Sequence, residues 1–464
     1  MALRRVGFSA LSLLVLVLAA TSVDAQNTTT TTTTSSSQVA GVAVDADGVL
    51  RMHVFADRNG ALARARISEA KRSLPADIFR ASKLRKISLN RLEAALDEQL
   101  RAGKKPTEAM LYLAGLQKLQ YIFFYPETGD IVLAGPAEGW ATDVSGRVRG
   151  VNTGNPVVEL QDLVVALRAF PPAGTSTPVI TCSIDPTKEG LANMQEFLRR
   201  IGATATPNQT KFIVDGLRRS LGLQNVTIGG IPADTHFAKV LVEADYRMKL
   251  IGIGLERTGV KMKSYVDLAS PATVSRNAMQ RWFFVPDYEC VRVTEDNLAM
   301  ELVGNSVKLV GADEMVAADG TRVAAGAGSA SGKRFVDGFT KMYSELAKAV
   351  PVYAQLRNLI DLSVAAAYIQ KQDYYGQAGW SMEVLGDENT YSVQTLPAPE
   401  RVETAVAGIW RGRRLMTPIG GGVNIQARLA LNSEHLLDDE QGAVMKKHST
   451  IVLDHLKPGD WWWD

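Results

Sequence analysis

The stretch from Asn225 to Gly252 reads NVTIGGIPADTHFAKVLVEADYRMKLIG and has the clearest local pattern in the chain. β-Branched residues at 226–228 predict a strand, and the glycines and the proline that follow end it. Asp234 or Thr235 can cap a helix, because a side-chain oxygen there accepts a hydrogen bond from a free N–H group of the first turn. Apolar residues then recur at helical spacing up to Gly252. The stretch therefore predicts a strand, a tight turn and an amphipathic helix.

Strands and helices alternate on the N-terminal side of this stretch. Residues 178–184 (PVITCSI) predict a strand, and the segments 187–202 and 208–221 predict helices. A further helix is predicted over 157–170. Alternation of this kind is typical of an α/β or α+β core. We expect one of these two fold classes.

Hairpins form the second regular feature. Apolar residues alternate about turn residues in three segments, which predicts β-hairpins over 39–55, 121–134 and 300–316. The sequence FFYPE at 123–127 is similar to FFVPD at 283–287, at an offset of 283 − 123 = 160 residues. Two diverged repeats and a chance similarity both remain open.

The length of 464 residues exceeds that of one ordinary core. Residues 39–323 are expected to form the main α/β region. The small, polar segment AAGAGSASG at 324–332 predicts a linker. A smaller C-terminal α+β region is expected over 333–464, with helices first and then strands at 382–385, 391–396, 402–409 and 423–431.

The N-terminus has the pattern of an export signal. Arg4 and Arg5 precede an apolar run over 11–20, and Val23-Asp24-Ala25 forms a small-x-small cleavage site. A signal peptide is therefore predicted over 1–25. Residues 26–38 are rich in Thr and Ser, of low complexity, and are expected to form a disordered spacer. The protein is predicted to be exported, to the periplasm, the cell surface or the extracellular space.

The composition limits the partners of the protein. Its formal net charge is only +2, and no basic run is interleaved with aromatic residues, so nucleic acid is not an expected partner. The run over 11–20 is short for a membrane span, and Arg357 and Asp361 interrupt the apolar helix predicted after Pro351. We expect no transmembrane span in the mature chain and an envelope protein or polymer as the partner.

Known cofactor and metal motifs are incomplete. The segment GSASGKR at 328–334 lacks the first glycine and the Ser or Thr of a phosphate-binding loop, so no cofactor is predicted. The histidines do not fall in His-x-x-x-His or similar pairs, so no metal site is predicted either.

Asp234, His236 and Glu243 are the candidate catalytic residues. His236 and Glu243 lie two helical turns apart, and Asp234 stands at the helix start. A carboxylate can orient an imidazole, which can then act as a general base near neutral pH. In the structural alternative Asp234 is a cap, and Lys239, Glu243 and Arg247 form a charge ladder. Without a complete catalytic set, we expect a binding or structural protein, with an exported hydrolase as the alternative.

Cys182 and Cys290 are the only cysteines of the chain. Both lie in apolar, alternating segments that predict core strands. Two cysteines of an exported protein can form one disulfide, and they can equally remain two buried thiols. Both alternatives remain open.

Several motifs resemble an uncharacterised exported protein family of planctomycete bacteria, the domain of unknown function 1598. The motifs are GDIVLAGPAEGW (129–140), SIDPTKEGL (183–191), PADTHFAKVLVEADYRMK (232–249) and PIGGGV (418–423). The resemblance extends over about 86–422 and implies export and a large assembled domain, but no activity, cofactor or catalytic residue. The Trp461–Trp463 tail lies outside it.

Overall fold

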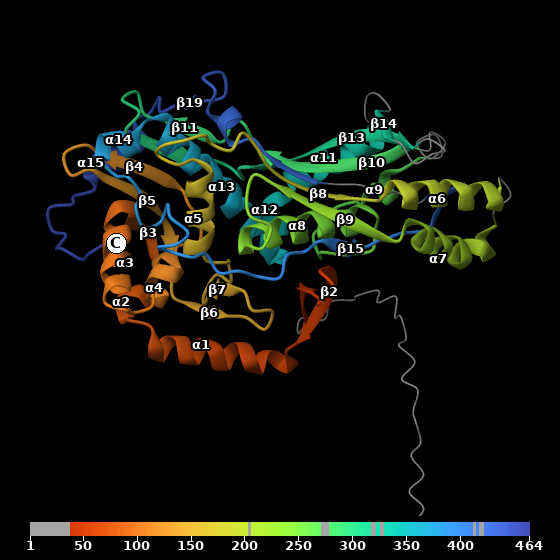
Figure 1. Cartoon of the computed structure of the whole chain (residues 1–464), viewed down its shortest axis with the longest axis horizontal. Helices are drawn as coiled ribbons and strands as arrows, with labels where there is room; N and C mark the ends of the chain where they lie inside the picture. Colours follow the sequence, from red (N-terminus) through yellow and green to blue (C-terminus); the bar gives the residue numbers. More distant parts are fainter. Residues whose placement is uncertain are drawn as a thin grey trace, which may run out of the picture. The chain divides into compact units, whose positions relative to one another are not determined.

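Most strands of the protein belong to two mixed sheets, and helices pack against them in an α+β arrangement (Figure 1). The computed structural model describes residues 38–202, 206–270, 278–316, 322–324, 329–411, 414–416 and 422–464. The predicted signal peptide and all but the last residue of the predicted spacer lie outside the described residues. The predicted α+β class, with a C-terminal region that is first helical and then contains strands, is confirmed.

The larger sheet combines strands from both ends of the described chain. Strands of the C-terminal region lie between strands of the main region: β15 between β2 and β9, and β18 between β8 and β10. The two regions therefore share one sheet. Its order is β1 (Gln38–Val44), β2 (Val49–Ala56), β15 (Arg401–Glu403), β9 (Leu223–Gly229), β8 (Ile180–Asp185), β18 (Gly422–Ile425), β10 (Ala278–Pro286), β13 (Val307–Val316) and β14 (Arg322–Ala324).

The smaller sheet also ends on strands from the C-terminal region. Its order is β19 (Leu437–Asp438), β11 (Val291–Val293), β12 (Ala299–Leu302), β4 (Tyr121–Tyr125), β5 (Asp130–Ala137), β3 (Ser82–Ser88) and β20 (Trp462–Trp463). Two short hairpins lie apart from both sheets, formed by β6 (Trp140–Thr142) with β7 (Val148–Gly150) and by β16 (Ile409–Arg411) with β17 (Arg414–Met416).

Several helices begin after a residue whose side chain caps them. Ser88, Thr107, Thr187, Thr235 and Ser329 each accept a hydrogen bond from a first-turn N–H group. The helices are α1 (Ala61–Ser73), α2 (Ala76–Phe79), α3 (Leu89–Arg101), α4 (Glu108–Leu111), α5 (Leu160–Ala169), α6 (Lys188–Ile201), α7 (Thr210–Leu221), α8 (His236–Gly252), α9 (Tyr265–Leu268), α11 (Ala330–Lys341), α12 (Tyr343–Ala349), α13 (Pro351–Lys371), α14 (Tyr374–Ala378) and α15 (Ala443–Thr450).

Helix α8 is buried on all sides, whereas its sequence predicts an amphipathic helix with a solvent-exposed polar face. Its charged residues are buried as well, and they pair at i, i+4 spacing: Glu243 with Arg247 at 3.2 Å and Asp245 with Lys249 at 3.1 Å. A buried charge is tolerated only when a partner compensates it. The polar positions therefore form internal ion pairs rather than a solvated face.

Helices α5 and α13 pack beside α8. Helix α13 contacts both α5 and α8, and α8 lies against strand β8. From Pro351 to Ile369 every residue of α13 except Arg357 is buried, as expected of a helix that is apolar around its whole circumference. Among the helices of the described residues, none is both long and apolar enough to cross a bilayer.

The structure corrects the prediction of one hairpin and of two strands. The hairpin predicted over 300–316 does not form, because β12 belongs to the smaller sheet and β13 to the larger one. The strands predicted at 382–385 and 391–396 are irregular segments. The similar motifs at 123–127 and 283–287 lie in different sheets, since β4 pairs with β5 and β12 in the smaller sheet whereas β10 pairs with β13 and β18 in the larger one. Alternating apolar residues reveal strands, but not the sheet in which they pair.

The predicted linker at 324–332 lies partly outside the described residues. Its last residues already form structure, because Ser329 caps α11 and Ser331 and Gly332 are buried. Ser329, Ser331 and Gly332 therefore belong to the start of a helix.

Arg85 of β3 holds the C-terminal tail against the smaller sheet. The guanidinium of this residue is 0% exposed and pairs with Asp464 at 2.8 Å. It also donates hydrogen bonds to the carbonyls of Asp77, Ile78, Arg80 and Ala114 at 2.6–3.1 Å. Its planar group lies 4.7 Å from the ring centre of Trp462. One buried cation thus joins β3, β20 and the segment around α2.

We expect Arg85→Met to lower the free energy of unfolding by about 3 kcal/mol, because it leaves Asp464 and several carbonyls without their partner. Arg101→Ala is the matched control, since Arg101 forms an exposed pair with Asp97 and should contribute less than about 1 kcal/mol. Urea denaturation measures both. Equal losses in the two variants would contradict the role given to Arg85.

Asp361 is a buried carboxylate in the middle of α13. It is 0% exposed, and neither of its oxygens has a hydrogen-bond partner among the described residues. Burial raises the pKa of Asp361 to about 6, although the positive charges of Lys118 and Arg357 act in the opposite direction. The ionised carboxylate is therefore disfavoured in the folded state.

Asp361→Asn is expected to stabilise the protein at alkaline pH. The folded-state pKa of about 6 lies above the ordinary value of 3.8, so the wild type loses stability as the pH rises from 3.8 through 6. The gain should be roughly 1–3 kcal/mol at pH 8 and close to zero at pH 4 or below. Urea denaturation at both pH values, with exposed Asp337→Asn as the control, tests this. A variant less stable than the wild type at pH 8 would show that the fold requires the charge.

Candidate functional site

The first turns of α5 and α8 bring three ionisable side chains together. Glu159 is the residue before α5, Asp162 lies in the first turn of that helix, and His236 is the first residue of α8. Acidic residues are favoured at these positions because the N-terminal end of a helix carries partial positive charge. The backbone of α8 is capped by Thr235, which leaves the side chain of His236 available for tertiary contacts.

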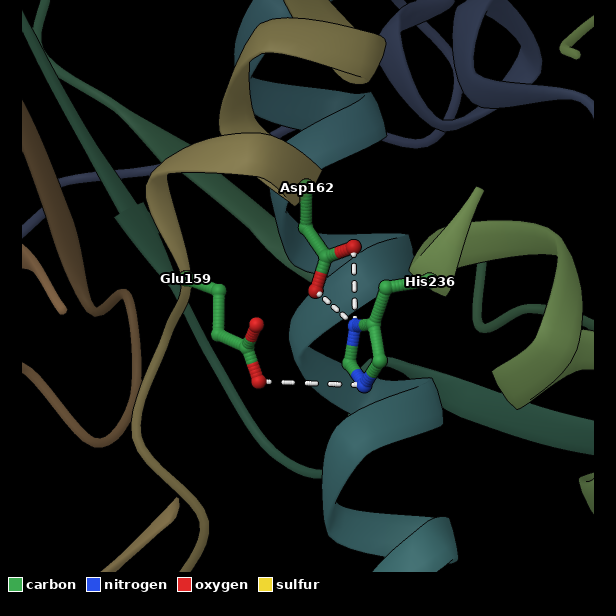
Figure 2. Close-up of side chains that lie close together, drawn as sticks. All are labelled: Glu159, Asp162 and His236. Atoms are coloured by element: carbon green, nitrogen blue, oxygen red, sulfur yellow. Dashed lines mark hydrogen bonds and ion pairs between the residues drawn. The ribbon is translucent and has the colours of Figure 1, made fainter. Parts of the chain in front are cut away.

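The imidazole of His236 lies between the two carboxylates (Figure 2). Its Nδ1 atom is 3.1 Å from Oδ1 and 2.9 Å from Oδ2 of Asp162, and its Nε2 atom is 3.7 Å from Oε1 of Glu159. The exposed fractions of the side chains are 17% for His236, 7% for Asp162 and 12% for Glu159. The group is thus mostly enclosed, with partial access to solvent.

The charges of the group depend on one another. Burial lowers the pKa of His236, but the carboxylates of Asp162 and Glu159 outweigh this effect and raise it to about 9. Burial raises the pKa of Glu159, and the neighbouring Asp162 adds to that, while His236 opposes it. The imidazolium of His236 therefore compensates the carboxylates, and the positive charge of Lys239 also lowers the pKa of Glu159.

Two glutamines complete the surroundings. The amide nitrogen of Gln161 donates to Oε2 of Glu159 at 2.5 Å. The Nε of Arg147 donates to Oε1 of Gln355 at 2.9 Å, which turns the NH2 group of Gln355 toward Nε2 of His236, 3.4 Å away. An NH2 group can only donate, so this contact favours a lone pair on Nε2. Glu159 therefore favours a proton on Nε2 of His236, whereas Gln355 favours a lone pair there.

Asp234, His236 and Glu243, which the sequence predicted as one site, have different partners in the structure. Glu243 forms ion pairs with Arg147 and Arg247 deep in the interior. The carbonyl of Asp234 accepts a hydrogen bond from the backbone of Leu396 at 2.7 Å, and Thr235 rather than Asp234 caps the helix. The carboxylates close to His236 are instead Asp162 and Glu159, 74 and 77 residues earlier in the chain.

Glu159 and Asp162 were not identified from the sequence as site residues. The only local signal is an acidic pair, Glu-x-x-Asp, at the start of a predicted helix, which is also the ordinary pattern of a helix N-terminus. Nothing in the sequence indicates that this helix start faces that of α8.

A cavity of about 430 Å³ lies beside the same part of α8. Its walls come from α5, from the loop that joins β9 to α8, and from the irregular segment around 388–395. Arg168 and Glu388 form an ion pair with each other in its wall. The remaining lining residues are mainly apolar or uncharged: Val165, Ala169, Thr177, Gly230, Ile231, Pro232, Thr235, Val393, Gln394 and Thr395, together with Asp234.

Cys182 and Cys290 are both buried free thiols, which is one of the two alternatives left open by the sequence. Cys182 lies on β8 of the larger sheet, and Cys290 directly precedes β11 of the smaller one. Burial raises the pKa of each thiol, that of Cys290 to about 12. Neither thiol is therefore activated as a nucleophile.

The region around α8 is also the part of the chain that matches a known family model. Residues 182–265 match the family model described as a protein of unknown function (DUF1598). The match runs from β8 to the start of α9 and contains His236 and Glu243, but neither Glu159 nor Asp162. No curated protein and no solved structure gives a significant match to the chain. The match supports an uncharacterised family and brings no activity with it.

We expect Glu243→Gln to destabilise the fold by about 3 kcal/mol, because it leaves the buried guanidinium of Arg147 without its compensating charge and leaves Arg247 to pair with Glu256. Asp234→Asn should change stability by less than about 0.5 kcal/mol, since no hydrogen bond or ion pair to its carboxylate is present within the described residues. Thermal and urea unfolding test the pair. If the glutamine variant is as stable as the wild type, Glu243 does not hold these helices together.

Proposed function

We propose that this protein is an exported binding protein of the cell envelope or extracellular space, and that the cavity beside α8 takes a small amphipathic ligand. The observation that carries the proposal is the cavity of about 430 Å³ itself, which is within the size range of pockets for small molecules. Five of its lining residues, between Gly230 and Thr235, belong to the segment matched by the family model.

The export part of the proposal is supported by the N-terminal sequence. A basic start, a short apolar run and a small-x-small site before Gln26 form the pattern of a cleaved signal. The resemblance to exported planctomycete proteins agrees with it. N-terminal sequencing should find Gln26 as the first residue of the mature protein, and a mature chain that begins at Met1 would contradict export.

The ligand chemistry follows from the lining. Arg168 and Glu388 neutralise each other, so Asp234 is the remaining charge on the wall. The apolar side chains of Val165, Ile231 and Val393 favour a hydrocarbon portion. We therefore propose a ligand with an apolar body and a cationic, hydrogen-bond-donating end, such as an amine carried by an envelope component.

Amine-bearing amphiphiles and their uncharged analogues, screened by native mass spectrometry, test this assignment. Thr395→Trp should abolish binding, because the indole occupies the cavity from its exposed rim. Asp234→Asn should weaken binding of the amine about 10-fold and leave the uncharged analogue unaffected. Thr450→Trp, at an exposed position outside the cavity, is the control. Equal binding by all variants would contradict the proposed site.

An exported hydrolase is the second candidate, and the hydrogen bond from His236 to Asp162 is the observation in its favour. A carboxylate that accepts a hydrogen bond from Nδ1 orients an imidazole so that its Nε2 can act as a general base. Among the described residues, the polar partners of His236 are Asp162, Glu159 and Gln355, and a hydroxyl or thiol nucleophile is not among them. If His236→Ala folds yet abolishes a turnover found in a hydrolase substrate screen, the binding-protein proposal fails.

A further inference from the structure

The cluster of Glu159, Asp162 and His236 combines an imidazole with two carboxylates in a mostly enclosed position. One ligand atom from each residue can be chosen so that all lie within 4.8 Å of one another. We propose that this cluster is a binding site for a divalent transition-metal ion of the Zn²⁺ class. The proposal is independent of the cavity, because it rests on other side chains.

The spacing of the donor atoms fits one ion. Zinc lies about 2.0–2.1 Å from imidazole nitrogen and about 2.0–2.2 Å from carboxylate oxygen, so two such ligands of one ion are at most about 4.3 Å apart. Oε1 of Glu159 and Nε2 of His236 are 3.7 Å apart. An ion can therefore lie between these two atoms in the observed arrangement of the side chains.

Among the described residues, neither of these two atoms has a partner at a short hydrogen-bond distance. The distance of 3.7 Å between them exceeds that of a hydrogen bond, and the amide nitrogen of Gln355, at 3.4 Å from Nε2, lies beyond the usual range of a good one. The other oxygen of Glu159, Oε2, is already held by Gln161 at 2.5 Å. Gln161 thereby fixes the carboxylate with Oε1 directed at the imidazole.

Asp162 has a positioning role in this arrangement. Metal-binding histidines usually donate the hydrogen of their second ring nitrogen to a carboxylate, which fixes the tautomer and the direction of the ring. The two oxygens of Asp162 lie 3.1 and 2.9 Å from Nδ1 of His236. A proton on Nδ1 leaves the lone pair of Nε2 for the ion.

The donor set indicates the class of cation. Magnesium and calcium prefer sites made of oxygen ligands, whereas imidazole nitrogen favours zinc and its neighbours among the transition metals. A divalent ion can compensate the carboxylates of Glu159 and Asp162, which are partly buried. The exposed fraction of His236, 17%, leaves room for water on the open side of the ion.

The sequence could not reveal this site by motif, because Glu159 and His236 are separated by 236 − 159 = 77 residues. Their meeting depends on the contact between α5 and α8. The absence of a His-x-x-x-His pair led to the prediction of no metal, but a site built from two helix starts has no such spacing.

Calorimetric titration with ZnCl2 tests the proposal on protein first treated with EDTA and then dialysed. One ion should bind per chain. With CoCl2 in place of zinc, a visible absorption band from cobalt coordinated by nitrogen and oxygen should appear at the same stoichiometry. A wild-type chain that takes up neither ion would overturn the proposal.

Variants locate the ion. Glu159→Gln keeps the side-chain length and removes a coordinating charge, so binding should be lost. Asp162→Asn should weaken binding about 10- to 100-fold and shift the cobalt band, as expected when the ring is no longer held in one tautomer. His435→Ala is the matched control, because His435 lies 3.6 Å from Glu434 at the surface, and it should bind like the wild type.

Circular dichroism in EDTA checks that each variant is folded. Folded Glu159→Gln and Asp162→Asn proteins that bind zinc as tightly as the wild type would place the ion elsewhere and overturn the proposal. The cavity proposal is tested separately, since Thr395→Trp should keep the metal and Glu159→Gln should keep the amine ligand.

Discussion

The burial of a charged helix is the constraint on which the rest of this structure depends. Helix α8 carries Glu243, Asp245, Arg247 and Lys249 into the interior, where a charge without a partner would cost several kcal/mol. The partners come from α8 itself, from Glu256 just beyond its end, and from a distant segment that supplies Arg147. Because Arg147 lies outside α8, its ion pair with Glu243 fixes the rotation of the helix and therefore where its first residue, His236, points.

The neighbours of α8 extend this constraint to the candidate site. Helix α13 contacts both α5 and α8 and supplies Gln355, which accepts a hydrogen bond from Arg147 and has its amide nitrogen 3.4 Å from Nε2 of His236. Arg147 therefore contacts Glu243 inside the protein and, through Gln355, the imidazole at the start of the helix. The ion pairs and the site form one polar network. A substitution of Glu243 can therefore alter the position of the His236 imidazole although the two residues do not touch.

Local structure was largely predictable from the sequence. The strand predicted at 226–228 lies within β9, and α8 ends at Gly252 as predicted, because turn residues and apolar spacing determine them locally. Of the two cap residues left open by the sequence, Asp234 and Thr235, it is Thr235 that caps α8. Pairing over long distances was not predictable. Strands β15, β18 and β20 are short and join partners that lie far away in the chain, and alternation alone does not identify those partners.

The site was predictable only in part, because local sequence patterns do not show which distant residues meet. His236 could be chosen because a histidine at a helix start is a distinctive local feature. Its carboxylate partners could not, since Glu159 and Asp162 look like ordinary residues of another helix start. Glu243 was chosen for its helical spacing, but the tertiary fold directs it to two arginines instead.

Anomalous X-ray diffraction at the zinc absorption edge, on crystals grown with zinc, tests the central claim most directly. The network described above predicts a peak about 2.0–2.2 Å from both Oε1 of Glu159 and Nε2 of His236, with Asp162 still bonded to Nδ1. A difference map with no peak at the imidazole, or with the ion held only by other side chains, would contradict it.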